Sequence, residues 1–320
     1  MTNPAPSIPA ENPAPLAPAL APAPQPSGGW ATQLARLTGW ELFLSWRRRG
    51  MVITLSVLLL IVYIICVLFV GFLWLEDSAV NGAGQSVYTS DLVYPGSISF
   101  AGGVFTDVGV LLLMVLVGAL IGSDYAYGVH RLSLARGVGR GQLLAAQIIA
   151  LALLALISSA VMLLLGALVG GVGSLMIGFG SAVTLAGVGE LIIYWLAVAL
   201  NAFVYSLIGL CVGTLGRSVA AAIAGPLVYI FVEFIATETL TLLLYIIRPS
   251  LLRNLVAGIP GYLLGFNTSA VMQLSLKAPY QLASSSDQIG WLHALLVILF
   301  YCAAMIIVTY TFFRSRDVRE

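Results

Sequence analysis

Charged side chains are scarce in this chain, and their scarcity excludes a water-soluble globular protein. Only 8% of the 320 residues are charged and 60% are hydrophobic, whereas a soluble domain carries about 25% charged residues. Uncharged stretches of 20 or more residues recur, and each is long enough to cross a bilayer as a helix. The composition therefore predicts an all-α integral membrane protein.

Lysine, histidine and cysteine are also nearly absent, and each shortage excludes a class of site. The one lysine, Lys277, follows Leu276, so the sequence does not contain the Gly-Lys-Ser/Thr of a P-loop. His130 and His293 are too few for a zinc site built on several imidazoles, and the three cysteines lie singly in apolar runs. No HExxH or GxSxG sequence occurs, and a net charge of +1 gives no field for nucleic acid. We therefore expect no enzyme activity, metal or cofactor in this chain.

The N-terminal segment differs from the rest. Residues 1–29 contain nine of the 14 prolines and one charge. Repeated Pro-Ala pairs cannot form a helix or bury a core, so we predict a disordered cytoplasmic tail. It lacks the basic start and apolar middle of a signal peptide.

Residues 30–50 show a helical period. Apolar residues recur at spacings of three and four, and the segment closes with three arginines. It is too short and polar to span, so we predict an amphipathic elbow helix at the cytoplasmic interface. The predicted apolar stripe is Trp30, Leu34, Leu37, Trp40 and Leu44. The predicted interfacial anchors are Trp30, Trp40, Trp46, Arg47, Arg48 and Arg49.

Six apolar stretches predict a six-helix transmembrane domain over residues 51–313, followed by a cytoplasmic tail at 314–320. The 49 uncharged residues between Arg140 and Glu190 are too many for one helix across a core of about 30 Å. We place a turn there at the glycine cluster of residues 166–180. After the fifth span we expect a short apolar piece at 239–247, then a long polar stretch. The predicted spans are 51–75, 104–122, 142–168, 189–216, 218–238 and 291–313.

The arginines give the orientation. With six spans, both ends lie on one side, and that side holds 11 of the 14 basic residues. Only Arg248, Arg253 and Lys277 fall on the other side. The positive-inside rule therefore predicts a multi-pass protein of the plasma membrane with both termini in the cytoplasm.

The loop after the second span resembles a known family. Residues 122–144, GSDYAYGVHRLSLARGVGRGQLL, are similar to the first cytoplasmic loop of type-2 ABC transporter permeases. The ending FFRSRDV at 312–318 is similar to that family's basic C-terminus, and the elbow helix and six spans also match. The resemblance extends over about residues 30–320. It implies a permease subunit, an exporter, that works with a second permease chain and a separate ATPase subunit carrying ATP and Mg.

The same resemblance implies that this loop docks on the ATPase. Arg136 and Arg140 are four residues apart and share a helix face, and Asp124 suits the start of a short interfacial helix. The alternative is that the arginines only fix orientation and bind lipid headgroups. The expected coupling residues are Asp124, Tyr125, Tyr127, Gly128, Arg131, Arg136 and Arg140.

Three acidic residues within the predicted spans are candidates for a substrate path. A carboxylate at mid-membrane costs at least about 2.5–3.5 kcal/mol, so it usually has a role. Asp107 and Glu190 fall in the first few residues of their spans on the outer side, whereas Glu233 lies about 22 Å along the fifth. Asn201 and Tyr205 on the fourth span extend the candidate path. Structural hydrogen bonds between helices are the alternative reading.

Two other functions stay open. A secondary carrier or channel would use the acids Asp107, Glu190 and Glu233 directly. A membrane-embedded enzyme or scaffold lacks a recognisable catalytic constellation. Nothing in the sequence identifies the cargo, so hydrophobic peptides, lipid-linked molecules, drugs and ions are all candidates.

Overall fold

A computed structural model describes residues 29–81, 86, 88–129, 135, 137–178, 185–247, 256, 258–275 and 290–315. The predicted N-terminal tail therefore lies outside the described residues, apart from Gly29. Six helices in the described part are long and apolar enough to cross a membrane, and a further helix precedes them. This confirms the predicted all-helical, six-span fold. The spans are Arg49–Val80, Gly96–Ala126, Arg140–Ile177, Gly187–Gly216, Val219–Ile246 and Trp291–Ser315.

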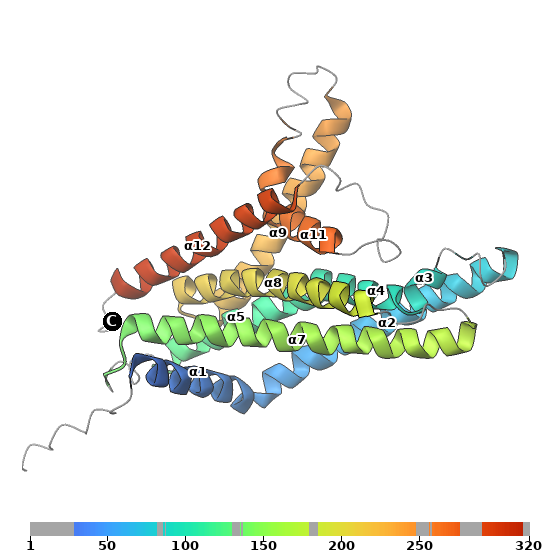
Figure 1. Ribbon diagram of the computed structural model, residues 1–320. Helices are drawn as coiled ribbons and strands as arrows, with labels where there is room; N and C mark the ends of the chain where they lie inside the picture. Colours follow the sequence, from blue (N-terminus) through green and yellow to red (C-terminus); the bar gives the residue numbers. More distant parts are fainter. Residues whose placement is uncertain are drawn as a thin grey trace, which may run out of the picture.

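Figure 1 shows α5, α7 and α8 packed side by side, with α1 and α2 on one flank and α12 on the other. The outer half of α9 rises away from this layer, and α11 and the start of α12 lie near its base. The helices are α1 (Trp30–Arg47), α2 (Arg49–Asn81), α3 (Thr89–Leu92), α4 (Gly96–Val104), the π-helix η1 (Phe105–Gly109), α5 (Val110–Ala126), α7 (Arg140–Ile177), α8 (Leu185–Gly216), α9 (Val219–Ile246), the 3-10 helix η2 (Pro260–Tyr262), α11 (Leu264–Ser275) and α12 (Trp291–Ser315).

The core lies where α5 and α8 meet. Met114, Val117, Leu207 and Leu210 are almost completely buried between them. Gly118 of α5 faces the backbone of α9 so closely that a Cβ there would overlap the Ala222 carbonyl oxygen. Small residues of this kind let membrane helices approach each other without a large apolar driving force.

The third span is longer than predicted, because α7 runs through most of the glycine cluster in which the turn was expected. Helix α7 continues to Ile177 and ends at Gly178, whose φ of +77° is the left-handed conformation that terminates helices. Gly166 and Gly170 lie inside the helix and face α4: a Cβ on Gly166 would be 2.5 Å from the Ala101 Cβ. Gly166 and Gly170 thus serve helix packing, and the helix ends only at Gly178.

Two other boundaries also need correction. The second span begins at Gly96 rather than 104, so Asp107 is 11 residues inside it and not among its first few. The short apolar piece at 239–247 is not separate, because α9 runs without a break to Ile246. The predicted polar stretch that follows contains η2 and α11.

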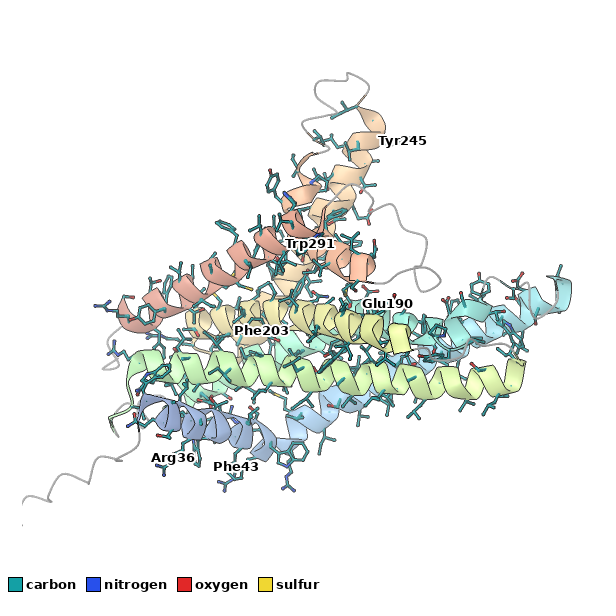
Figure 2. All side chains as sticks on the ribbon, viewed as in Figure 1. Arg36, Phe43, Glu190, Phe203, Tyr245 and Trp291 are labelled. Carbon is teal, nitrogen blue, oxygen red and sulfur yellow. The ribbon has the colours of Figure 1, made fainter. Side chains whose placement is uncertain are left out.

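The elbow helix forms as predicted, but its apolar residues divide between two faces. Leu34 and Leu37 are half-buried and Thr38 is buried on the side that meets α7, whereas Trp40 is 48% exposed. Arg36 and Phe43 point away from the bundle in Figure 2. Tryptophan and arginine on the outward face fit the predicted contact with lipid headgroups.

Candidate functional site

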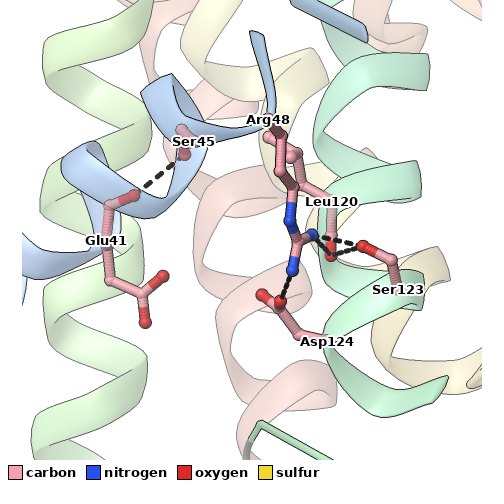
Figure 3. Close-up of polar contacts among 6 residues, drawn as sticks. All are labelled: Glu41, Ser45, Arg48, Leu120, Ser123 and Asp124. Atoms are coloured by element: carbon pink, nitrogen blue, oxygen red, sulfur yellow. Dashed lines mark hydrogen bonds and ion pairs between the residues drawn. The ribbon is translucent and has the colours of Figure 1, made fainter. Parts of the chain in front are cut away.

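An arginine between α1 and α2 joins the elbow helix to the C-terminal end of α5. The Arg48 guanidinium donates to the Leu120 carbonyl oxygen at 2.9 Å and to the Ser123 hydroxyl, and it forms an ion pair with Asp124 (Figure 3). The Asp124 side chain is only 7% exposed. A buried carboxylate without such a partner is strongly destabilising, so the pair holds α1 and α5 together.

These contacts correct two predictions. Arg48 is not a lipid anchor, because its charged group turns inward to Asp124. Asp124 does not start a new interfacial helix, because it lies in the last turn of α5 and is buried there.

Glu41 of α1 and Gln147 of α7 complete this cluster. With Arg48 and Asp124 they line an enclosed space of about 40 Å³, which is room for about one water molecule. Burial raises the pKa of Glu41 to about 7; the nearby Asp124 charge adds to the effect, and Arg48 and the Gln147 side chain oppose it. The elbow helix therefore carries a carboxyl group that titrates near neutral pH at its contact with the bundle.

The remaining loop residues have diverse surroundings. The Arg217 guanidinium lies 5.9 Å from the ring centre of Tyr125, and Arg140 Nη1 donates to the Arg314 carbonyl oxygen at 2.8 Å. Tyr127, in contrast, is 80% exposed at the end of α5, and Gly128 follows it with a φ of +68°. Arg131 and Arg136 lie outside the described residues. Among the described residues that were predicted to contact an ATPase, Tyr127 is thus the most exposed.

A second site lies nearer the N-terminal end of the second span. A cavity of about 1010 Å³ opens between η1, α8, α9, α11 and the start of α12. Four of the five residues predicted for a substrate path line it: Asp107, Asn201, Tyr205 and Glu233. The fifth, Glu190, is not in its lining and lies on the outer part of α8 (Figure 2).

Local helix geometry places Asp107 on this cavity. It lies in the π-helical turn η1, where the five-residue hydrogen-bond step shifts the side chains relative to a regular helix. Such π-turns occur frequently at functional sites. Thr106, beside it, donates to the Gly102 carbonyl oxygen at 2.8 Å and contacts the Met272 sulfur at 3.3 Å, so η1 is tied to α11.

Glu233 joins three helices at the cavity wall. Its Oε2 accepts a hydrogen bond from the Tyr205 hydroxyl at 3.0 Å, and its Oε1 accepts one from the Gly265 backbone N–H at 2.6 Å. Both partners are neutral donors, so neither compensates the negative charge of an ionised carboxylate. Glu233, which was predicted for a substrate path, therefore lines the cavity and also forms hydrogen bonds between helices, which was the alternative prediction.

Residues 258–275, which the structure describes between α9 and α12, contribute to the cavity wall, and their helices η2 and α11 were not predicted from the sequence. Asn267 Nδ2 donates to the Gly261 and Leu263 carbonyl oxygens at 2.9 and 2.7 Å, which fixes the turn into α11. His293 Nε2 lies 2.8 Å from the same Gly261 oxygen, which ties the turn to α12. The signal available in the sequence was the uncharged run from residue 254 to 276, long enough for a helix that does not span.

Among the residues that the structure describes, no three His, Cys, Asp or Glu side chains form a metal-binding group. The fold and these two sites define a multi-pass helical membrane protein with an N-terminal helix tied to the bundle and a polar cavity between its helices. Residues 99–319 match the family described as protein of unknown function (DUF2705), and the chain belongs to that family. No curated protein matches the chain.

Proposed function

We propose that this chain is the transmembrane permease subunit of an ATP-driven transporter of the ABC type, and that it acts in export. ATP and Mg are bound by a separate ATPase subunit, which docks on the cytoplasmic loop 123–140. The resemblance of that loop to type-2 ABC permeases supports this function, as do the six spans and the arginine-rich cytoplasmic side.

One observation carries the proposal: a single continuous helical span has the loop at one end and the cavity in its outer half. The span Gly96–Ala126 leads directly into Tyr127, and it carries Asp107 on the cavity wall. Its α5 part packs extensively on α8 and α9, which supply Asn201 and Glu233. A displacement of the loop would therefore be passed along a packed helix to the cavity.

A second permease chain is part of the proposal. Helix α9 has only two buried residues, Ala222 and Pro226, in the described chain. Its large apolar side chains, among them Val228 and Phe231, are about 60% exposed. This face is available to lipid or to a second copy, and the resemblance favours a second copy for part of it.

A secondary carrier or channel is the second candidate function, and it is favoured by one observation. Asp107 and Glu233 line the same cavity, as a proton- or ion-coupled path would need. Such a carrier would be driven by an ion gradient and would have no use for an ATPase on loop 123–140.

The test is the effect of two loop variants on ATPase association. Tyr127→Ala and Arg136→Glu should keep wild-type levels in the membrane and lose most of the co-purifying ATPase, because truncation of a central contact costs about 2 kcal/mol or more. Matched controls are Tyr245→Ala, a tyrosine 89% exposed at the far end of α9, and Lys277→Glu. Normal association in both loop variants would leave the loop as an orientation signal and would contradict the proposal.

A further inference from the structure

The cavity has an excess of acidic side chains over basic ones in its described lining. Asp107 and Glu233 both line it, and its described lining contains no lysine or arginine. Neither carboxylate has a basic partner among the described residues. The one basic side chain in the lining is His293, whose Nε2 is already directed at the Gly261 carbonyl oxygen. An uncompensated pair of carboxylates in a largely apolar region attracts a cation.

A buried amide supplies independent evidence for a ligand. Asn201 is 1% exposed and lines the cavity, yet its Oδ1 has no hydrogen-bond partner. Its Nδ2 lies 3.9 Å from the Met272 sulfur, a weak acceptor. A buried acceptor without a partner is destabilising, and a ligand that donates an N–H would remove this penalty.

Aromatic and aliphatic side chains form one part of the remaining lining, beside threonine, serine and glutamine side chains. Phe234 and Phe266 come from two different helices, Tyr262 from the turn at η2, and Ile230 and Val110 complete an apolar wall. The Tyr205 hydroxyl is held by Glu233, which leaves its ring as part of that wall. Rings beside carboxylates suit a cation with an apolar body, through burial of apolar surface and cation–π attraction.

We infer that this cavity binds an amphiphilic organic ammonium ion. The ammonium group would lie between the carboxylates of Asp107 and Glu233 and donate to Asn201 Oδ1, and the apolar part would contact the aromatic wall. The role of this ligand as the transported substrate rests on the proposed function. Its binding to the cavity does not rest on that function, because binding requires no ATP. The ammonium group could belong to a free amine or to the headgroup of a lipid such as phosphatidylethanolamine.

Binding is tested on the full chain in phosphatidylglycerol nanodiscs, without an ATPase. The probe is dansylcadaverine, a fluorescent primary ammonium ion, and its matched control is the N-acetylated form, which is neutral and nearly the same shape. The signal from empty nanodiscs is subtracted. We expect saturable binding of the ammonium probe and about tenfold to hundredfold weaker binding of the acetylated form, since a charge-assisted hydrogen bond contributes about 1.5–3 kcal/mol.

Variants locate the site. Glu233→Gln and Asp107→Asn keep the side-chain shapes and should each weaken binding of the ammonium probe about tenfold, and Asn201→Leu should weaken it as well. Glu190→Gln removes an acid of α8 that is outside the cavity lining and should have no effect. Equal affinity for both probes, or equal loss in Glu190→Gln and Glu233→Gln, would overturn the inference. Thermal stability of each variant separates loss of binding from loss of fold.

Nanodiscs that contain phosphatidylethanolamine distinguish the two sources of the ammonium group. Competition by this lipid against dansylcadaverine would show a lipid headgroup in the cavity, and unchanged binding would show a site for free amines. The proposed function fails separately: an intact ATPase complex with no ammonium binding would refute the cavity ligand only. Ammonium binding in a chain that has no ATPase partner would refute the transporter type only.

Discussion

Replacing Glu41 by glutamine should change how the elbow helix binds to the bundle, and in a pH-dependent way. When α1 is docked, Glu41 lies in an enclosed cluster with Asp124, and burial is the main cause that raises its pKa from 4.5 to about 7. When α1 separates from the bundle, the carboxyl group returns to water and to its ordinary pKa.

The direction of the pH effect depends on which state, docked or separated, binds the Glu41 proton more tightly. The docked state binds this proton more tightly, because the pKa of Glu41 is raised there. Glu41 therefore has no effect on docking below pH 4.5, weakens docking as the pH rises from 4.5 to 7, and has a constant effect above pH 7. Each pH unit in this window changes the docking free energy by about 1.4 kcal/mol, or roughly 3 kcal/mol in all. Glu41→Gln should therefore strengthen docking by roughly this amount at pH 8 and have little effect at pH 4.5.

Hydrogen exchange of the α1 backbone measures the docking directly. After correction for the intrinsic pH dependence of exchange, protection of residues 30–47 in the wild type should fall roughly a hundredfold between pH 5 and pH 8. Glu41→Gln should remove most of this fall, and Glu76→Gln, which changes an exposed acid on α2, should not. If the pH dependence of the wild type persists unchanged in Glu41→Gln, protonation of Glu41 does not control the docking of α1.

Two further predictions concern stability. Arg48→Ala leaves Asp124 buried without its ion pair, so it should destabilise the protein by about 3–5 kcal/mol in denaturant unfolding, whereas Arg47→Ala on the exposed side should change it by less than about 0.5 kcal/mol. Equal effects would show that the pair is unimportant. Gly170→Val should destabilise by about 1–3 kcal/mol, because its Cβ would overlap the Ser97 hydroxyl, and Gly171→Val, which meets open space, should be tolerated. Equal melting temperatures of the two glycine variants would contradict the packing of α4 on α7.

The sequence predicted the spans because an uncharged run of 20 or more residues has few alternatives in a bilayer. It misplaced the turn after the third span because glycine serves both turns and close helix contacts, and only the position of α4 decides between them. It could not place Asp107, since the helix begins at Gly96 within a segment rich in glycine and serine that reads as a loop.

The site was predictable only in part, for a related reason. Polar residues within apolar spans are conspicuous, so Asp107, Asn201, Tyr205 and Glu233 could be singled out, and the cavity brings them together. The partner of Asp124 could not be predicted, because Arg48 is 76 residues away in the chain and is one of three adjacent arginines. Which of the three turns inward depends on the angle between α1 and α2, which has no local signal.

We propose that ATP hydrolysis in a separate subunit drives transport by this chain. The most direct test is to purify the tagged full chain from its native membranes into nanodiscs and to measure vanadate-sensitive ATP hydrolysis in the preparation. We expect a P-loop ATPase to co-purify with the wild type and ATP hydrolysis to be measurable. Both should be lost in Tyr127→Ala but kept in Tyr245→Ala. A stable wild-type chain with neither an ATPase subunit nor ATP hydrolysis, and with transport driven by an ion gradient, would contradict it.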